Sequence, residues 1–133
     1  MAAFCAKILE DKHAEEIVIL DLRGMSALAD FFLFATAEST RQFRAISESI
    51  RRTCKSHKVK VGNIEGKESG RWLLVDLFDV IVHVFDPESR IYYDLELLWG
   101  DAPRLDWNGI ETPEIPQTPA REERVYRTLS LPE

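Results

Sequence analysis

The sequence of 133 residues contains little cysteine and no long apolar run. Its two cysteines, Cys5 and Cys54, lie far apart and belong to no CxxC or Cys/His cluster, which argues against a disulfide framework and a zinc site. No segment approaches the ~18 consecutive apolar residues of a membrane-spanning helix. Charged residues begin at Lys7, too early for a secretory signal peptide. We therefore expect a cytoplasmic protein with reduced thiols, no membrane contact, no metal and no cofactor.

Basic charge is also scarce, since 17 Lys and Arg face 23 Asp and Glu and the formal net charge is −6. Broad electrostatic binding to nucleic acid usually requires a positive patch, so the overall charge argues against it. An acidic surface does favour association with a basic protein. The length and a hydrophobic share of 45% are ordinary for one folded domain with a proper core.

Proline is nearly absent from the first hundred residues. Five of the six prolines follow residue 101, at positions 103, 113, 116, 119 and 132. Repeated X-Pro steps disfavour helix, and this stretch shows no hydrophobic periodicity. We predict one domain over residues 1–100 and a Pro-rich, mobile C-terminal tail over residues 101–133.

The first hundred residues alternate between helical and strand-like patterns. We expect helices over residues 4–13, about 40–58 and 87–100, and strands over 16–22, 31–36 and 59–65, followed by a hairpin over 71–86. Ser39 or Thr40 is the expected N-cap of the long helix. This order predicts an α/β protein with a single mixed β-sheet of about five strands and flanking helices.

The hairpin over residues 71–86 is the most informative segment. With Phe78 and Asp79 as its turn, alternate residues share a face, and one face is wholly aliphatic. The opposite face collects Trp72, Leu74, Asp76, Ile81, His83 and Phe85. Aromatic residues mixed with polar ones are typical of protein interfaces, so we predict a docking surface. The alternative is that a helix covers this face and both polar groups find internal partners.

The segment Gly24-x-Ser26-x-x-x-Asp30 faintly resembles the entry to a nucleotidyltransferase site, in which a Gly-Ser turn precedes two carboxylates that hold magnesium. Phe32 occupies the position of the second carboxylate. A lone carboxylate is a poor magnesium site, and Asp21, the other local acid, lies on a separate element. We therefore expect no metal site here.

Two further patterns have both a chemical and a structural interpretation. Asp76 and His83 share a hairpin face and could form a general base with its orienting acid, but the hairpin offers no Ser or Cys nucleophile. The long helix carries a basic stripe that includes Arg41, Arg44 and Arg51. This stripe is either a peripheral contact for ribosomal or other RNA or the ordinary solvated face of an amphipathic helix.

Several strings match one family in the right order. They are Asp21-x-Arg23-Gly24-x-Ser26-x-x-x-Asp30, Ser39-Thr40-Arg41, Glu65-Gly66, Trp72-Leu73-Leu74-Val75-Asp76, Asp79-Val80-Ile81-Val82-His83-Val84-Phe85 and Tyr93-Asp94-Leu95-Glu96-x-Leu98-Trp99. Together they resemble the ribosomal silencing factors, the Iojap-like family, over nearly all of residues 5–103. The chain departs from the family at Phe78, where a turn Gly is usual, at Gln42, and at Ala37-Glu38. The Phe78 departure leaves the turn type open.

The resemblance implies a translational repressor without enzymatic activity. Such factors bind the large ribosomal subunit through large-subunit ribosomal protein number fourteen and sterically block association with the small subunit. The resemblance also implies a nucleotidyltransferase-like topology without the metal site, and a homodimer off the ribosome. Residues on the mixed hairpin face and the last helix are the predicted partner-binding set: Trp72, Leu74, Asp76, Ile81, His83, Phe85, Tyr93, Asp94, Glu96 and Trp99. The alternatives are a degenerate nucleotidyltransferase-like enzyme and an RNA-binding module.

Overall fold

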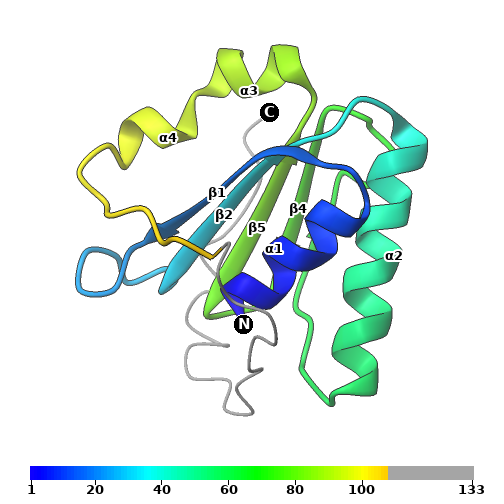
Figure 1. The fold of residues 1–133 in the computed structure, drawn as a ribbon, viewed down its shortest axis with the longest axis horizontal. Helices are drawn as coiled ribbons and strands as arrows, with labels where there is room; N and C mark the ends of the chain where they lie inside the picture. Colours follow the sequence, from blue (N-terminus) through cyan, green and yellow to red (C-terminus); the bar gives the residue numbers. More distant parts are fainter. Residues whose placement is uncertain (108–133) are drawn as a thin grey trace.

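The computed structural model describes residues 1–107, apart from the side chains of Glu96 and Leu98 (Figure 1). The helices are α1 (Ala2–Asp11), α2 (Thr40–Ser56), α3 (Pro87–Tyr93) and α4 (Leu95–Leu98). The strands are β1 (Glu15–Asp21), β2 (Phe31–Thr36), β3 (Ile64–Glu65), β4 (Trp72–Asp76) and β5 (Val80–Phe85). The predicted α/β fold is confirmed, although the strand expected over residues 59–65 shrinks to two residues.

All five strands belong to one sheet in the order β1-β2-β5-β4-β3. Strands β2 and β5 run parallel, and every other neighbouring pair is antiparallel, so the sheet is mixed as predicted. In the hairpin, Leu73 lies opposite Val84 and Val75 opposite Val82, which confirms the predicted register.

The hairpin turn contains a residue with a left-handed backbone conformation, and that residue is Phe78 rather than a glycine. Phe78 has φ +70°, a conformation that is uncommon for a bulky residue. Its amide donates to Oδ1 of Asp76 at 2.8 Å, and the ring is buried against Gly62. A Cβ on Gly62 would lie 2.9 Å from Cζ of Phe78, so that glycine leaves room for the ring. Packing and one hydrogen bond thus stabilise the strained turn.

Helices α1 and α2 cover the aliphatic face of the sheet (Figure 1). Ser39 is the N-cap of α2, and its hydroxyl accepts from the amide of Gln42 at 3.1 Å. The buried side of α2 presents Phe43, Ile46 and Ile50, each fully buried. This layer also encloses Cys5 and Cys54 as free thiols, as expected for a protein without disulfides.

The C-terminal helix predicted to run from residue 87 to Gly100 is in fact two short helices. Asp86 caps α3 by accepting from the amide of Ser89 at 2.7 Å, and Pro87 occupies the first turn. The helix ends at Asp94, which is left-handed with φ +43°, and α4 begins at Leu95. The prediction of one continuous helix is therefore wrong. The sequence gives no warning of the break, because neither a glycine nor a proline lies at Asp94.

Residues 101–107 continue the domain, whereas a mobile tail was predicted to begin at 101. The amide of Asp21 donates to the carbonyl of Pro103 at 2.8 Å, and the amide of Leu105 donates to the carbonyl of Ile19 at 2.9 Å. Ala102 and Trp107 are buried. These contacts protect the outer edge of β1, so the domain extends to residue 107. The rest of the predicted tail, residues 108–133, lies outside the described residues.

Within residues 1–107, every helix is too short or too polar to span a membrane.

Candidate protein-interaction site

The mixed hairpin face is buried, so the predicted exposure of this surface is wrong. The side chains concerned are all at most 6% exposed: Trp72, Leu74, Asp76, Ile81, His83 and Phe85. The half-buried residues Tyr93, Leu95 and Trp99 pack over them from α3, α4 and the turn that follows. The alternative interpretation is correct about the helical cover. Its second part is only half met, because among residues 1–107 neither Oδ2 of Asp76 nor Nε2 of His83 has a hydrogen-bond partner. These hairpin residues therefore support the helices above them rather than meeting solvent.

The buried face is an aromatic core. The ring of Trp72 lies 4.6 Å from that of Tyr93 and 4.9 Å from that of Phe85. On the other side of the cluster, Phe32 packs edge-on against Trp99 at 5.7 Å. Such ring pairs add to the hydrophobic free energy of burial, which explains how two short helices are held on the sheet.

His83 lies at the centre of this aromatic core. Its Nδ1 accepts from Nε1 of Trp72 at 3.2 Å, and its ring stacks on Phe34 at 5.2 Å. Burial lowers the pKa of His83 to about 3, because an apolar site disfavours the imidazolium. The ring is therefore neutral near pH 7, with its proton on Nε2. This geometry fits a structural histidine.

Asp76 does not orient His83. One carboxylate oxygen of Asp76 accepts from the amide of Phe78, and the other has no hydrogen-bond partner among residues 1–107. Burial raises the pKa of this carboxyl above its usual range. The hypothetical Asp76–His83 catalytic pair is therefore absent from the structure, and Asp76 instead fixes the hairpin turn.

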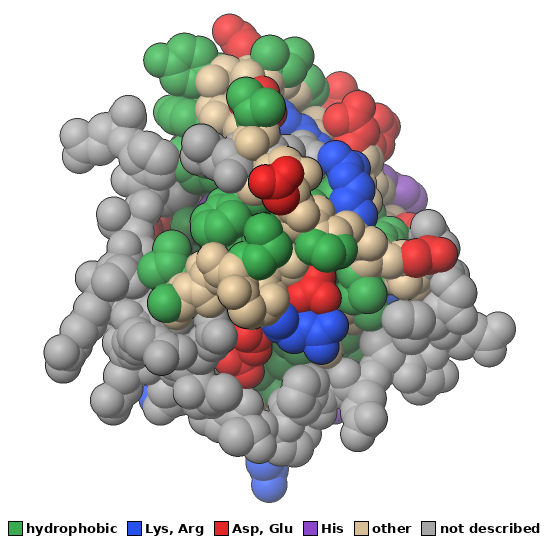
Figure 2. All heavy atoms as spheres, turned by 90° about the vertical axis from the view of Figure 1, so that its left-hand side faces the viewer, with side chains coloured by type: hydrophobic (Ala, Val, Ile, Leu, Met, Phe, Trp, Pro, Cys, Tyr) green, Lys and Arg blue, Asp and Glu red, His purple; other side chains and the backbone are tan. Residues whose placement is uncertain are grey.

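Above the aromatic core, α3 and α4 carry an exposed apolar surface. Ile91 and Tyr92 are 80% exposed and Leu97 is 75% exposed, whereas the only other exposed large hydrophobic residue among the described side chains is Met25. We call the exposed residues Glu88, Ile91, Tyr92, Asp94 and Leu97 the α3–α4 surface. Figure 2 looks onto this side of the molecule, where hydrophobic side chains are interspersed with acidic ones.

The sequence analysis found only part of this surface. It selected Asp94, which is exposed, and Tyr93 and Trp99, which are half-buried; the side chain of Glu96 lies outside the described residues. It missed the three exposed apolar residues of α3 and α4. A usable signal was present, because the segment from 91 to 99 holds more large apolar residues than one helix face can bury.

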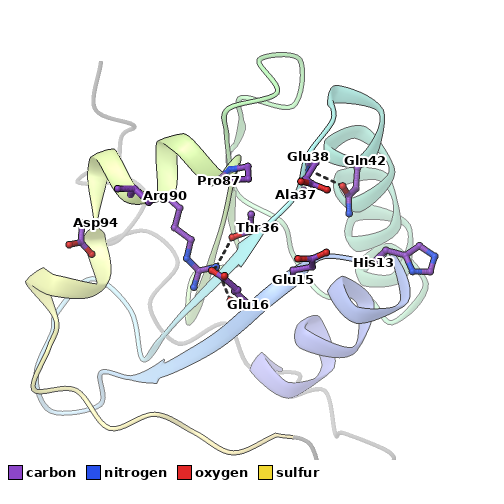
Figure 3. A pocket seen from close by; sticks show the side chains of 11 residues that line it. His13, Glu15, Glu16, Thr36, Ala37, Glu38, Gln42, Pro87, Arg90 and Asp94 are labelled. Atoms are coloured by element: carbon purple, nitrogen blue, oxygen red, sulfur yellow. Dashed lines mark hydrogen bonds and ion pairs between the residues drawn. The ribbon is translucent and has the colours of Figure 1, made fainter.

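A cleft of about 560 Å³ lies beside α3, between that helix and the ends of β1 and β2 (Figure 3). Arg90 crosses it, and its Nη1 donates to the carbonyl of Glu16 at 2.7 Å and to the hydroxyl of Thr36 at 2.8 Å. The carboxylates of Glu15 and Glu38 lie at the opposite side of the cleft. Arg90 thus fastens α3 to the sheet and sets the position of the α3–α4 surface.

The basic stripe lies on the other side of the sheet. Arg41, Arg44 and Arg51 are exposed on α2, which covers the aliphatic face. Arg44 forms an ion pair with Glu68. The structure therefore separates the stripe from the α3–α4 surface by the thickness of the sheet.

The segment compared with a nucleotidyltransferase site has a different role. The carboxylate of Asp21 accepts from Arg23 at 2.7 Å, and this hydrogen bond keeps the pKa of Asp21 below its usual range. Phe32 points into the aromatic core and is 5% exposed. Among the described side chains, no three of His, Cys, Asp or Glu cluster closely enough to hold a metal ion.

Comparison with known proteins gives a consistent result. The family model described as "Ribosomal silencing factor during starvation" matches residues 1–130. The chain is 46% identical to the ribosomal silencing factor of Bacillus subtilis over 76% of this chain and 86% of that protein. It is 42% identical to that of Halalkalibacterium halodurans, over 77% and 87%. A crystal structure from Chromobacterium violaceum superposes with a TM-score of 0.69 at 41% identity, over 72% of this chain and 80% of that chain. The chain belongs to the family of ribosomal silencing factors.

Proposed function

We propose that this protein is a translational repressor that binds the large ribosomal subunit through large-subunit ribosomal protein number fourteen. The bound protein sterically blocks association with the small subunit, and it acts without enzymatic activity. The α3–α4 surface is the contact. The relatives are named as ribosomal silencing factors, which supports a ribosomal partner.

The single observation that carries the site is the concentration of exposed apolar side chains on α3 and α4. Of the four exposed large hydrophobic residues among the side chains that the structure describes, three fall within seven positions, from Ile91 to Leu97. Exposed apolar groups gathered in this way, with a polar rim, mark interaction surfaces. Tyr92 is a suitable anchor because tyrosine supplies a large contact area and a hydroxyl donor.

Charge supports a basic partner for this surface. Glu88 and Asp94 are exposed beside the apolar residues, and the whole chain has a net charge of −6. Carboxylates at the rim form charge-assisted hydrogen bonds with Lys or Arg and accelerate encounter with a basic protein. The predicted partner-binding residues of the hairpin keep a supporting role in this proposal, since they hold α3 and α4 in place.

The test is co-sedimentation with isolated large and small subunits, combined with a subunit-joining assay on a sucrose gradient. We expect the protein to bind large subunits and purified ribosomal protein number fourteen, and to reduce the yield of joined ribosomes. Tyr92→Ala should weaken binding by roughly 30-fold, which corresponds to about 2 kcal/mol for an interface anchor. The fold should survive, because Tyr92 is 80% exposed.

Met25→Ala is the matched control, because it truncates an exposed hydrophobic residue in the loop between β1 and β2. It should bind large subunits like the wild type. The oligomeric state of each variant must be recorded, since the family resemblance implies a homodimer off the ribosome. Absence of binding to large subunits would overturn the function, and equal losses in the two variants would overturn the site.

A further inference from the structure

Charge is distributed very unevenly along this chain. Residues 40–60 contain seven of the 17 basic residues and one of the 23 acidic residues. The formal net charge is therefore +6 over this stretch and −12 over the rest of the sequence. The overall acidity conceals one strongly basic segment, most of which is helix α2.

The helix gathers its basic residues on one side. At 3.6 residues per turn, they fall within an arc of about 100°, well away from the buried Phe43, Ile46 and Ile50. We call this set the α2 basic face, and all of its members are exposed: Arg41, Arg44, Arg51, Arg52 and Lys55. From Arg41 to Lys55 the face is about 21 Å long.

Two carboxylates partly neutralise the α2 basic face. Arg44 pairs with Glu68 and Arg52 with Glu48 at 3.7 Å, all with side chains more than half exposed. Exposed ion pairs contribute little to the free energy of folding, so these arginines can exchange their carboxylate partner for another anion. Arg41, Arg51 and Lys55 form no ion pair with any side chain that the structure describes. The face therefore presents a net charge of about +3 by this pairing.

We propose that the α2 basic face binds the phosphate backbone of RNA. Four of its five residues are arginines, whose planar guanidinium matches phosphate oxygens in two parallel hydrogen bonds. Arg41 and Arg44 are three positions apart and Arg51 and Lys55 are four, which places the Cβ atoms within each pair about 5–6 Å apart. Glu48 lies between the two pairs, so the face offers two clusters of cations to the phosphates of a nucleic-acid strand. No aromatic residue is exposed along α2, so the face has no aromatic platform for base stacking, and we expect binding that depends on phosphate contacts.

This surface is independent of the proposed protein contact. Helix α2 covers the aliphatic face of the sheet, and α3 and α4 cover the aromatic face. Each surface can thus be occupied without displacing the ligand of the other. The inference goes beyond the proposed function, because an RNA contact on α2 adds a second point of attachment that does not use the α3–α4 surface.

The test measures binding to a 20-base-pair RNA duplex of arbitrary sequence between 50 and 200 mM salt. For about three phosphate contacts, the slope of log K against log salt should be about −2 to −3. Arg51→Gln combined with Lys55→Gln should bring this slope about 2 units closer to zero and weaken binding by about tenfold or more at 50 mM salt.

The matched control is Arg23→Gln combined with Arg104→Gln, which removes the same charge from exposed positions near the edge of β1. It should bind the duplex like the wild type. Equal weakening in both double variants, or no salt-dependent binding by the wild type, would overturn the proposal.

The same duplex assay separates this inference from the proposed function. Tyr92→Ala should bind the duplex normally while binding large subunits more weakly, whereas the α2 variant should bind the duplex more weakly. Should the α2 variant lose large subunits although the wild type never binds the duplex, the face would recognise an acidic protein, and the RNA proposal would be wrong.

Discussion

The two faces of the sheet use different chemistry to bury a similar set of strands. The face under α1 and α2 is aliphatic and contains Leu73, Val75 and Val84 from the hairpin, against a 17-residue helix. The face under α3 and α4 is aromatic, contains His83, and is covered by helices of seven and four residues. A long helix fixes its layer through many side chains, whereas short helices depend on a few ring contacts. The second layer should therefore be the more adaptable one.

Adjacent leucines on β4 allow this difference to be measured directly. Leu73 and Leu74 are both buried, at 0% and 1% exposure, but they point to opposite faces. Truncation of a buried leucine costs about 2–5 kcal/mol, depending on how far the surroundings relax into the cavity. We expect Leu73→Ala to cost about 4 kcal/mol and Leu74→Ala about 3 kcal/mol, because α3 and α4 can move.

Urea unfolding of the two variants under identical conditions gives both values, with the slope checked for two-state behaviour. A cost for Leu74→Ala that equals or exceeds that of Leu73→Ala would show that the aromatic layer is as rigid as the aliphatic one. That result would contradict the comparison.

The contrast also explains what the sequence could predict. Period-two alternation identified the hairpin and its register, since Leu73 and Val84 face each other as expected. The same pattern could not tell whether the second face is exposed. Its cover comes from Tyr93, Leu95 and Trp99, which lie beyond a helix break at Asp94 that carries no glycine or proline. Resemblance identified the family, but burial depends on tertiary contacts that no local pattern encodes.

Acid should weaken the aromatic face only. Burial lowers the pKa of His83 to about 3 in the folded state. Below about pH 6.5 the unfolded chain, whose histidine has an ordinary pKa, therefore binds a proton at this residue that the folded chain does not bind. Stability from this residue is present above about pH 6.5 and is lost as the pH falls, at about 1.4 kcal/mol per unit. Between pH 6.5 and 5 the loss is about 2 kcal/mol. Among the described residues, Cys5 and Cys54 are the only titratable groups that the aliphatic face buries. Burial raises their pKa values to about 12 and 11, so both thiols stay neutral.

His83→Gln isolates this effect, because glutamine keeps an acceptor for Nε1 of Trp72 but does not titrate. Asp76 acts in the opposite direction, since its raised pKa stabilises the folded state as the pH falls, and it is present in both proteins. The difference in unfolding free energy between wild type and His83→Gln should therefore change by about 2 kcal/mol from pH 6.5 to 5. A constant difference would mean that the folded state accommodates a charged His83.

The helix caps provide the smallest test of the comparison. Ser39 caps α2 on the aliphatic side, and Asp86 caps α3 on the aromatic side, each by accepting one backbone amide. Removing either cap with alanine should cost about 1 kcal/mol, but in different places. Ser39→Ala should lower the global free energy of unfolding, because α2 separates from its core only when the domain unfolds. Asp86→Ala should mainly open α3 locally, because a seven-residue helix can detach while the sheet remains folded.

Hydrogen exchange distinguishes the two cases through single amides. The amide of Asp94, which donates to the carbonyl of Arg90, should exchange about fivefold faster in Asp86→Ala than in the wild type, while amides of β5 keep their rates. Asp86→Asn retains the acceptor without the charge and should lie between the two. Because α3 carries Ile91 and Tyr92, local opening would also weaken the proposed ribosomal contact without lowering global stability. Uniform acceleration across α3 and β5 would instead show that the short helices and the sheet unfold as one unit, and that the two faces are equally cooperative.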